Sequence, residues 1–289
     1  MRFRSLAALA ALTPTVVCRL LTQDERAALL AADRAAAQLS SDSGFVAALE
    51  SAAHRDAVLL WPGAPVASGA EEIRSLLGGL PSRDSVRLVW QPLGLELARD
   101  SSLGVTWGIA VASPRTSDAP PRIGRYTTMW RRDERRWTIA ALLVTGLAPV
   151  AAGALKPELP LTKERPSDVT GPFVEADLAF ARLAAERGAA VAFRHWAAAE
   201  AFTLGGGGLM TRGPMEIGNA VAGPATWRWH PVAAGASHTG DLGWTVGEAT
   251  ITPKDSGPEY GKYLTVWIRH SGGAIRFLTD VGNARPPTP

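Results

Sequence analysis

The sequence has a single cysteine, Cys18, among its 289 residues. One cysteine forms neither an internal disulfide nor a Cys-Cys zinc site, so a disulfide-stapled fold and a zinc ribbon are both excluded. The chain also lacks a Gly-x-Ser-x-Gly nucleophile elbow, a Gly-x-x-x-x-Gly-Lys-Ser/Thr phosphate loop and a His-Glu-x-x-His metal motif. We therefore predict no nucleotide cofactor and no metal.

A strong charge of one sign is absent as well. The chain has 30 basic and 27 acidic residues, which gives a formal net charge of +3. The densest basic stretch, Arg131–Arg136, encloses two acidic residues and is typical of a solvated hairpin turn. Recognition of nucleic acid needs Lys and Arg gathered on one face. No such face is predicted, so we exclude a nucleic-acid partner.

The apolar run Leu6–Val17 is too short to cross a bilayer comfortably, so we predict no membrane span. Arg2 and Arg4 precede this run, which is the pattern of a secretory signal. We predict a signal peptide over residues 1–18 and export to the periplasm or the exterior. A lipoprotein is disfavoured, because the residue before Cys18 is larger than the small residue that such a site needs. The alternative is a frayed N-terminal helix of a cytoplasmic protein.

What the chain does contain is an internal repeat. A series of Ala, Asp, Gly and Ile residues recurs at a constant offset, so that Asp33 matches Asp177 (177 − 33 = 144). Further on, Gly-Arg-Tyr at 124–126 matches Gly-Lys-Tyr at 261–263 (261 − 124 = 137). A period of this length is that of a whole small domain. We predict two copies of one fold: a first domain over 19–148, a Pro-rich linker over 149–170 and a second domain over 171–285.

Each copy shows helix signals first and strand signals afterwards. The capping box Thr22-x-x-Glu25 predicts a first helix that runs to about Leu39. The remaining elements are predicted near 44–53, 57–61, 70–77, 86–97, 103–113, 123–130 and 137–144, and in the second copy near 173–186, 188–199, 201–204, 214–221, 226–234, 241–252, 262–269 and 274–281. This order is typical of the α+β class. We predict two tandem conical α+β barrels, each with three helices packed on a curved, mainly antiparallel sheet.

Several segments resemble a known family. In both copies an acidic residue precedes an apolar strand, at Asp56 and at Glu200, and a Gly-x-x-x-Ile helix follows. The second copy adds three strand signatures, at Gly240–Gly247, Gly261–Trp267 and Leu278–Asn283. These segments are similar to the SnoaL-like and ketosteroid-isomerase-like domains of the nuclear-transport-factor-2-like superfamily. The resemblance covers nearly all of both copies and implies a cone with a pocket between sheet and helices. Isomerases, cyclases, dehydratases, ligand binders and structural modules share this fold, so activity must be argued from the site.

The catalytic candidates are Asp280, His230 and Tyr263, because ketosteroid isomerase itself works with carboxyl groups and a tyrosine. Asp280 lies near the end of the last strand, where it would act as a general base or hold a ligand hydroxyl; the alternative is a structural bond to backbone or a neighbouring Arg. His230 follows Trp229, so the two side chains point to opposite faces of a strand. Tyr263 recurs as Tyr126, which indicates a shared packing role.

Aromatic residues of the second copy supply the candidates for a ligand pocket, and the alternative for all of them is core filling. Most belong to predicted strands, whereas the pair at 195–196 belongs to a helix and has no counterpart in the first copy. That pair would also fit an interface between the copies. The pocket candidates are Trp227, Trp229, Trp244, His195 and Trp196.

Comparison of the two copies separates scaffold from candidate site. Asp33 and Asp177 occur in both, so we interpret them as structural, either capping backbone or pairing with an Arg of the sheet. Asp280 and His230 occur in the second copy alone, and simple alignment places a hydrophobic residue near Leu142 opposite Asp280. We therefore expect any working pocket in the second copy, with the first copy as its built-in partner.

Three functions remain open from the sequence. The first is an exported protein whose two domains form an intramolecular pseudo-dimer and bind a small apolar ligand in the second domain. The second is an acid/base isomerase, cyclase or dehydratase that acts on a small hydrophobic substrate. The third is a non-catalytic interaction module, which is favoured if both cones are filled by their own side chains.

Overall fold

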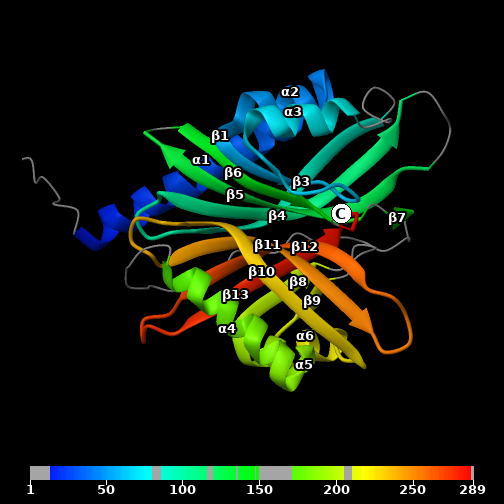
Figure 1. Cartoon of the computed structure of the whole chain (residues 1–289). Coiled ribbons are helices and arrows are strands. Elements are labelled where there is room, and N and C mark those ends of the chain that lie inside the picture. Colours follow the sequence, from blue (N-terminus) through cyan, green and yellow to red (C-terminus); the bar gives the residue numbers. More distant parts are fainter. Residues whose placement is uncertain are drawn as a thin grey trace, which may run out of the picture.

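The computed structural model describes residues 14–79, 86–115, 120–134, 136–146, 148–149, 171–204 and 210–287. These residues form two halves that follow one another along the chain (Figure 1). The first half contains α1 Pro14–Ser43, α2 Phe45–Ala52, β1 Ala53–Leu60, β2 Ala67–Ser68, α3 Gly69–Gly79, β3 Val86–Leu97, β4 Leu103–Pro114, β5 Arg122–Asp133, β6 Arg136–Val144 and β7 Ala148–Pro149. The second contains α4 Gly171–Arg187, α5 Ala189–Trp196, β8 Ala197–Leu204, β9 Met210–Arg212, α6 Pro214–Ala220, β10 Ala225–Ala236, β11 Leu242–Pro253, β12 Glu259–Arg269 and β13 Ile275–Ala284.

The two halves have the same sheet topology. The first sheet has the order β2-β1-β6-β5-β4-β3, with β7 added beside β5, and the second has the order β9-β8-β13-β12-β11-β10. In each sheet one neighbouring pair is parallel, β1 with β6 and β8 with β13, and the other pairs are antiparallel. The prediction of two tandem α+β cones is confirmed. Among the described strands the two edges of a sheet do not pair with each other, so neither sheet closes into a barrel.

Matched glycines produce the same chain turns in both halves. Gly44 separates α1 from α2 with φ of 96°, and Gly188 separates α4 from α5 with φ of 86°. Their ψ values of 159° and 155° complete a backbone conformation that is essentially restricted to glycine. The repeat therefore preserves the residue type that the turn between the two helices requires.

The structure differs from the predicted elements mainly at α1 and at short strands. The helix α1 begins at Pro14, so Thr22 lies inside it and does not cap its start. A capping box inside a sequence does not interrupt a helix whose first turn lies closer to the N-terminus. The strands β2, β7 and β9 were not predicted, because two or three residues are too few to show an alternating pattern. Residues 1–13 of the predicted signal peptide lie outside the described residues. None of the helices that the structure describes combines the length and apolar character of a membrane crossing.

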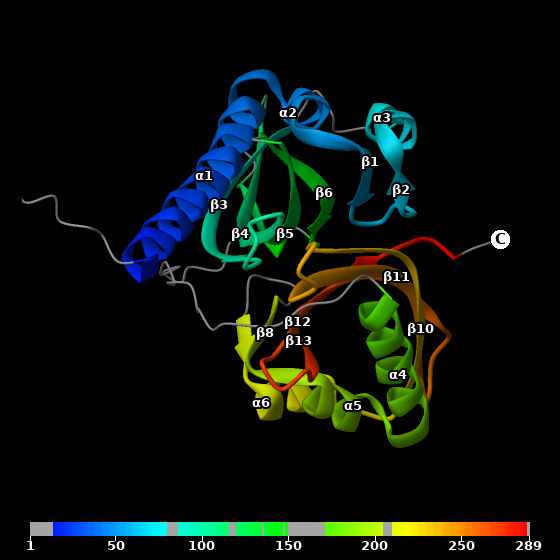
Figure 2. The same ribbon diagram turned by 90° about the vertical axis from the view of Figure 1, so that its left-hand side faces the viewer.

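The sheets of the two halves face each other, and their helices lie on the outside of the pair (Figures 1 and 2). One core cluster of buried apolar side chains includes members from both sheets. At its centre Trp107 of β4 packs against Phe202 of β8, with ring centroids 4.8 Å apart. Part of the outer face of each sheet is therefore buried against the other sheet rather than exposed to solvent.

The hairpin loops β3–β4 and β10–β11 contact each other reciprocally. The Arg99 N–H donates to Asp241 Oδ2 at 3.0 Å, and the His238 N–H donates to Ser102 Oγ at 3.0 Å. The two bonds are equivalent in the repeat, because adding its offset of 139 to Arg99 and Ser102 gives His238 and Asp241 (99 + 139 = 238; 102 + 139 = 241). Reciprocal contacts of this kind are the signature of a two-fold interface. The two halves thus meet around an approximate two-fold axis.

Candidate functional site

A buried carboxylate on the first helix anchors the interior of the second half. Asp177 of α4 is fully buried, and its Oδ2 accepts the Tyr263 hydroxyl at 3.0 Å. The Trp229 indole N–H donates to Asp177 Oδ1 at 2.8 Å. Beside them, the Trp267 indole N–H donates to Thr245 Oγ1 at 2.8 Å. The two bonds to Asp177 tie α4 to the inner face of β10 and β12.

The first half contains the same network. Asp33 of α1 is fully buried and accepts the Tyr126 hydroxyl at 2.7 Å and the Trp90 indole N–H at 2.5 Å. The Trp130 indole N–H donates to Thr106 Oγ1 at 2.8 Å. A network present in both halves serves the fold that both share. The interpretation of the repeated aspartates as structural is consistent with this, but their partners are indole and phenol groups and not the Arg side chain or backbone that the sequence suggested.

Burial and hydrogen bonding act in opposite directions on these aspartates. Burial raises the pKa of Asp33 and of Asp177, and the donated hydrogen bonds oppose that rise. Burial also raises the pKa of Tyr126 and of Tyr263, and the neighbouring carboxylate raises it further. Both hydroxyls therefore stay protonated, as the hydrogen bonds to the carboxylates require.

Asp280 is where the two interiors differ. It lies on β13 opposite Thr265 of β12, and the Thr265 hydroxyl donates to Asp280 Oδ2 at 2.6 Å. In the first half, Leu142 faces Thr128 at the equivalent position and is buried. The alignment that placed a hydrophobic residue opposite Asp280 therefore agrees with the strand registers. The second half carries one carboxyl group that its partner lacks.

The surroundings of Asp280 raise the pKa of its carboxyl group to near neutral pH. Burial raises the pKa of Asp280 to about 7, the charge of Asp177 adds to the rise, and the hydrogen bond from Thr265 opposes it. The charge of Asp280 in turn adds to the raised pKa of Tyr263. Asp177, Tyr263 and Asp280 are thus one electrostatic cluster on the inner side of β12 and β13. The Asp280 residue is only half-buried, so solvent reaches it.

His230 acts on this cluster through its charge, which lowers the pKa of Asp177, but its side chain does not point into the cluster. The strand β10 alternates between half-buried and exposed residues, with Trp227 and Trp229 half-buried and His230 exposed. Trp229 reaches α4 through its bond to Asp177, so His230 lies on the opposite face of the sheet. Of the three catalytic candidates, the structure brings together Tyr263 and Asp280 alone.

Three of the predicted pocket aromatics belong to a packed cluster. Phe180 of α4 contacts Trp229 with ring centroids 4.7 Å apart and Trp196 at 6.4 Å. Phe193 of α5 contacts Trp227 at 5.8 Å. Ring contacts at these separations are typical of a filled aromatic core. The rings of Trp196, Trp227 and Trp229 thus pack with Phe180 and Phe193 of the helices α4 and α5.

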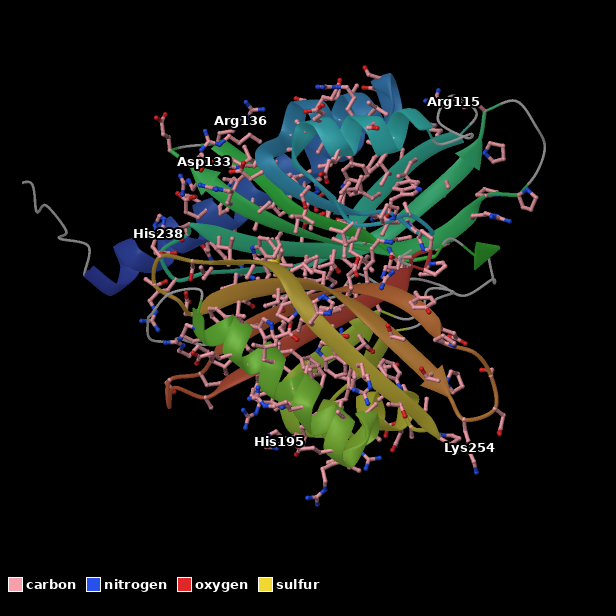
Figure 3. All side chains as sticks on the ribbon, viewed as in Figure 1. Arg115, Asp133, Arg136, His195, His238 and Lys254 are labelled. Atoms are coloured by element: carbon pink, nitrogen blue, oxygen red, sulfur yellow. The ribbon has the colours of Figure 1, made fainter. Side chains whose placement is uncertain are left out.

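The other two pocket candidates lie elsewhere. A Cβ on Gly243 would meet Phe173 of α4, so position 243 faces the helices and Trp244 faces the opposite way. Trp244 is buried in the core cluster that both halves share. His195 is exposed on α5 and points away from the molecule on the side far from the first half (Figure 3). Trp244 and His195 therefore share no space with Trp227 and Trp229.

Two residues of the site were not singled out from the sequence. Thr245 and Thr265 match Thr106 and Thr128 of the first half at the offsets of their own strands (245 − 106 = 139; 265 − 128 = 137). Their recurrence in both halves is the sequence signal that identifies them. Within the part of the chain that the structure describes, no group of three or more His, Cys, Asp or Glu side chains is placed to hold a metal ion.

No family model matches this sequence, and no curated protein matches it significantly. Solved structures do match. An NTF2-like protein with a cystatin-like fold from Novosphingobium aromaticivorans is 19% identical, with a TM-score of 0.40, over 51% of this chain and 95% of its own. A ketosteroid isomerase-like protein from Erwinia carotovora atroseptica is 14% identical, with a TM-score of 0.35, over 43% and 96%. The hexachlorocyclohexane dehydrochlorinase LinA-type3 from Novosphingobium barchaimii is 17% identical, with a TM-score of 0.36, over 49% and 99%. Each likeness spans about half of this chain and concerns the fold alone.

Proposed function

We propose that the second half binds one small, largely apolar molecule and that Asp280 contacts the polar atom of that molecule. The observation that supports this most directly is the presence of Asp280 where the otherwise matched interior has Leu142. A carboxyl group in an apolar interior costs stability, so its presence in one half alone favours a function there. The half-buried side chain offers contact with a ligand, and the neighbouring Asp177 carboxyl group favours a neutral or hydrogen-bond-donating partner over an anion.

The packed aromatic cluster limits the size of the ligand. Because Phe180, Trp196 and Trp229 already pack against one another, we propose that the ligand lies beside Asp280 and Thr265 instead. A compact molecule with one hydroxyl or carbonyl group fits this chemistry. The Tyr263 hydroxyl is already engaged with Asp177, so Asp280 is the better candidate for direct contact.

Acid/base chemistry is the second candidate, and the pKa of Asp280 favours it. A group with a pKa of about 7 is populated in both protonation states near neutral pH, which suits general acid/base catalysis. An isomerase, cyclase or dehydratase of a small hydrophobic substrate would use Asp280 to take a proton from one atom and return it to another. Tyr263 and Asp177 would then support Asp280 through the electrostatic cluster without touching the substrate.

Binding of naphthol, a planar neutral molecule with one hydroxyl group, tests the proposal. We expect the wild-type chain to bind naphthol in a fluorescence titration and in a thermal-shift assay. Replacing Asp280 with alanine should weaken binding by about tenfold, because a hydrogen bond to a carboxyl group contributes on the order of 1.5 kcal/mol. The matched control is Asp255→Asn, which changes an exposed carboxylate of the same half and should bind as the wild type does.

Two results would contradict the proposal. Equal affinity of wild type and Asp280→Ala would show that naphthol binds elsewhere. No binding of naphthol, cyclohexanone or another compact neutral probe to the wild type would favour the third candidate, an interaction module. The packed interior of both halves is the feature that supports that candidate.

Export and the domain boundaries rest on the sequence. We propose that the chain is exported, that the first domain spans 19–148 and the second 171–285, and that 149–170 connects them. Sequencing the N-terminus of protein recovered from the producing cells tests the first point. A start near residue 19 supports export, and an intact N-terminus in the cytoplasm contradicts it.

A further inference from the structure

Strand β12 of the second half reaches the first half through a buried lysine. The Lys262 ammonium donates to the carbonyl oxygens of Trp61 at 2.7 Å, Ala64 at 2.6 Å and Ala284 at 3.0 Å. Trp61 and Ala64 belong to the loop between β1 and β2, whereas Ala284 ends β13. An ammonium group has three N–H donors, and here each has a carbonyl acceptor. Lys262 is fully buried, which lowers its pKa to about 7, and these three oxygens replace water around the ammonium group.

A second side chain continues the same contact. Asn283 of β13 donates its amide hydrogens to the carbonyl oxygens of Leu60 at 2.9 Å and Val144 at 2.7 Å, which are the last residues of β1 and β6. The Gly63 N–H donates to the Ala284 carbonyl oxygen at 2.9 Å. We call Lys262 and Asn283 together the inter-half clasp.

The clasp lies on the two strands that carry the candidate site. Lys262 pairs with Asn283 in the register of β12 and β13, and the next pairs along these strands include Tyr263 with Gly282 and Thr265 with Asp280 (Figure 2 shows β12 and β13 beside the first half). Lys262 and Tyr263 are neighbours on one strand, so their side chains point to opposite faces. The clasp therefore contacts the first half from the outer face of strands whose inner face holds Asp280.

The clasp residues differ in type from their counterparts in the first half. Arg125 stands where Lys262 does, and Thr145 stands where Asn283 does. The Thr145 hydroxyl accepts the backbone N–H of Arg125 within its own half at 2.8 Å, whereas the Asn283 amide donates to carbonyl oxygens of the other half. The hairpin contact, in contrast, is reciprocal between the halves. A Lys–Asn pair present only in the half that also carries Asp280 indicates a role connected with Asp280.

We propose that Lys262 and Asn283 are positioning residues for Asp280, so that the first half completes the site of the second half by holding β12 and β13 in place. The inference rests on the proposed function in that Asp280 is the group that meets the ligand. Without the clasp, the carbonyl oxygens of Ala64 and Leu60 lose their side-chain donors, and that of Trp61 keeps only the Ala64 N–H. Buried carbonyl groups are rarely left unpaired, so the loop separates from the strand ends and water enters between them. The strand pair then loses its fixed position, and Asp280 becomes more exposed.

The experiment follows the titration of the Asp280 carboxyl carbon by ¹³C NMR without any ligand. In Lys262→Met and in Asn283→Thr, we expect the midpoint to fall by about one pH unit or more toward the ordinary value, because greater exposure removes the effect of burial. Lys262→Arg keeps a cationic donor and introduces the residue that the first half has at the equivalent position, Arg125. We expect this variant to keep the wild-type midpoint. Asp241→Ala weakens the hairpin contact at the other end of the interface and should leave the midpoint unchanged.

Two outcomes would overturn the inference. One is an unchanged midpoint in both clasp variants while circular dichroism shows them folded. The other is an equal fall in Asp241→Ala, which would mean that any loosening of the interface has this effect. Because Asn283→Thr is the milder change, it keeps the test decisive if Lys262→Met does not fold. A shifted midpoint together with absent naphthol binding would remove the proposed ligand and leave the positioning role standing.

Discussion

Replacing Asp177 with alanine should lower the free energy of unfolding by about 4 kcal/mol, because two buried donors lose their acceptor and each unpaired group costs on the order of 1–3 kcal/mol. The donors are the Tyr263 hydroxyl and the Trp229 indole N–H. Asp33→Ala should cost a similar amount, since Tyr126 and Trp90 lose the same acceptor in the first half. Urea unfolding at neutral pH measures both.

The matched control for each variant is the change to asparagine. The amide that this change introduces retains one acceptor oxygen, so Asp177→Asn and Asp33→Asn should each cost about half as much as the change to alanine. The comparison between the halves decides the role of the network. Suppose that Asp33→Ala greatly lowers the free energy of unfolding while Asp177→Ala raises it. Asp177 would then be a functional group held at a cost to stability, which contradicts its structural role.

Replacing Asp280 with asparagine should make the protein more stable above about pH 4, and the gain should reach its full size above about pH 7. The folded-state pKa of Asp280 is raised to about 7 from an ordinary value of 3.8. The folded chain therefore binds the proton more tightly, and the stability that this provides is present below about pH 4 and is lost as the pH rises through 7. A shift of this size corresponds to about 4 kcal/mol at most, and the half-buried position reduces the expected gain to about 2 kcal/mol at pH 8.

Unfolding by urea at pH 4 and at pH 8 measures this difference. Asp280→Asn should match the wild type at the lower pH, where both side chains are neutral, and exceed it at the higher pH. The control is Asp255→Asn, which should show no such pH dependence because this carboxylate is exposed. A loss of stability in Asp280→Asn at both pH values would mean that the carboxyl group holds the strand pair together, in line with the structural alternative for this residue.

The fold could be predicted from the sequence because each residue type that recurs in the repeat is required by the structure of one half. Gly44 and Gly188 recur since the turn they form excludes other residues, and Asp33 and Asp177 recur since each accepts two buried donors. These requirements are local to one half, so both halves retain them. The repeat in the sequence therefore distinguishes the shared scaffold from Asp280.

The partners within the site were not accessible, because they depend on contacts distant in the sequence. Asp33 and Tyr126 are 93 residues apart, and nothing local indicates that the hydroxyl of one meets the carboxylate of the other. Strand alternation predicted that Trp229 and His230 face opposite ways but left open which face is the inner one. The same limit applies to Trp244, whose outward direction follows from the packing of the two sheets.

The most direct test of the central claim is the titration of Asp280 in the wild-type chain, followed at its carboxyl carbon by ¹³C NMR and assigned with Asp280→Asn. Asp280, which has no carboxyl counterpart in the first half, is expected to exchange its proton near neutral pH. We therefore expect a midpoint near 7 for Asp280. A midpoint near the ordinary value of 3.8 would show that Asp280 titrates as an exposed carboxylate does, and would contradict this account.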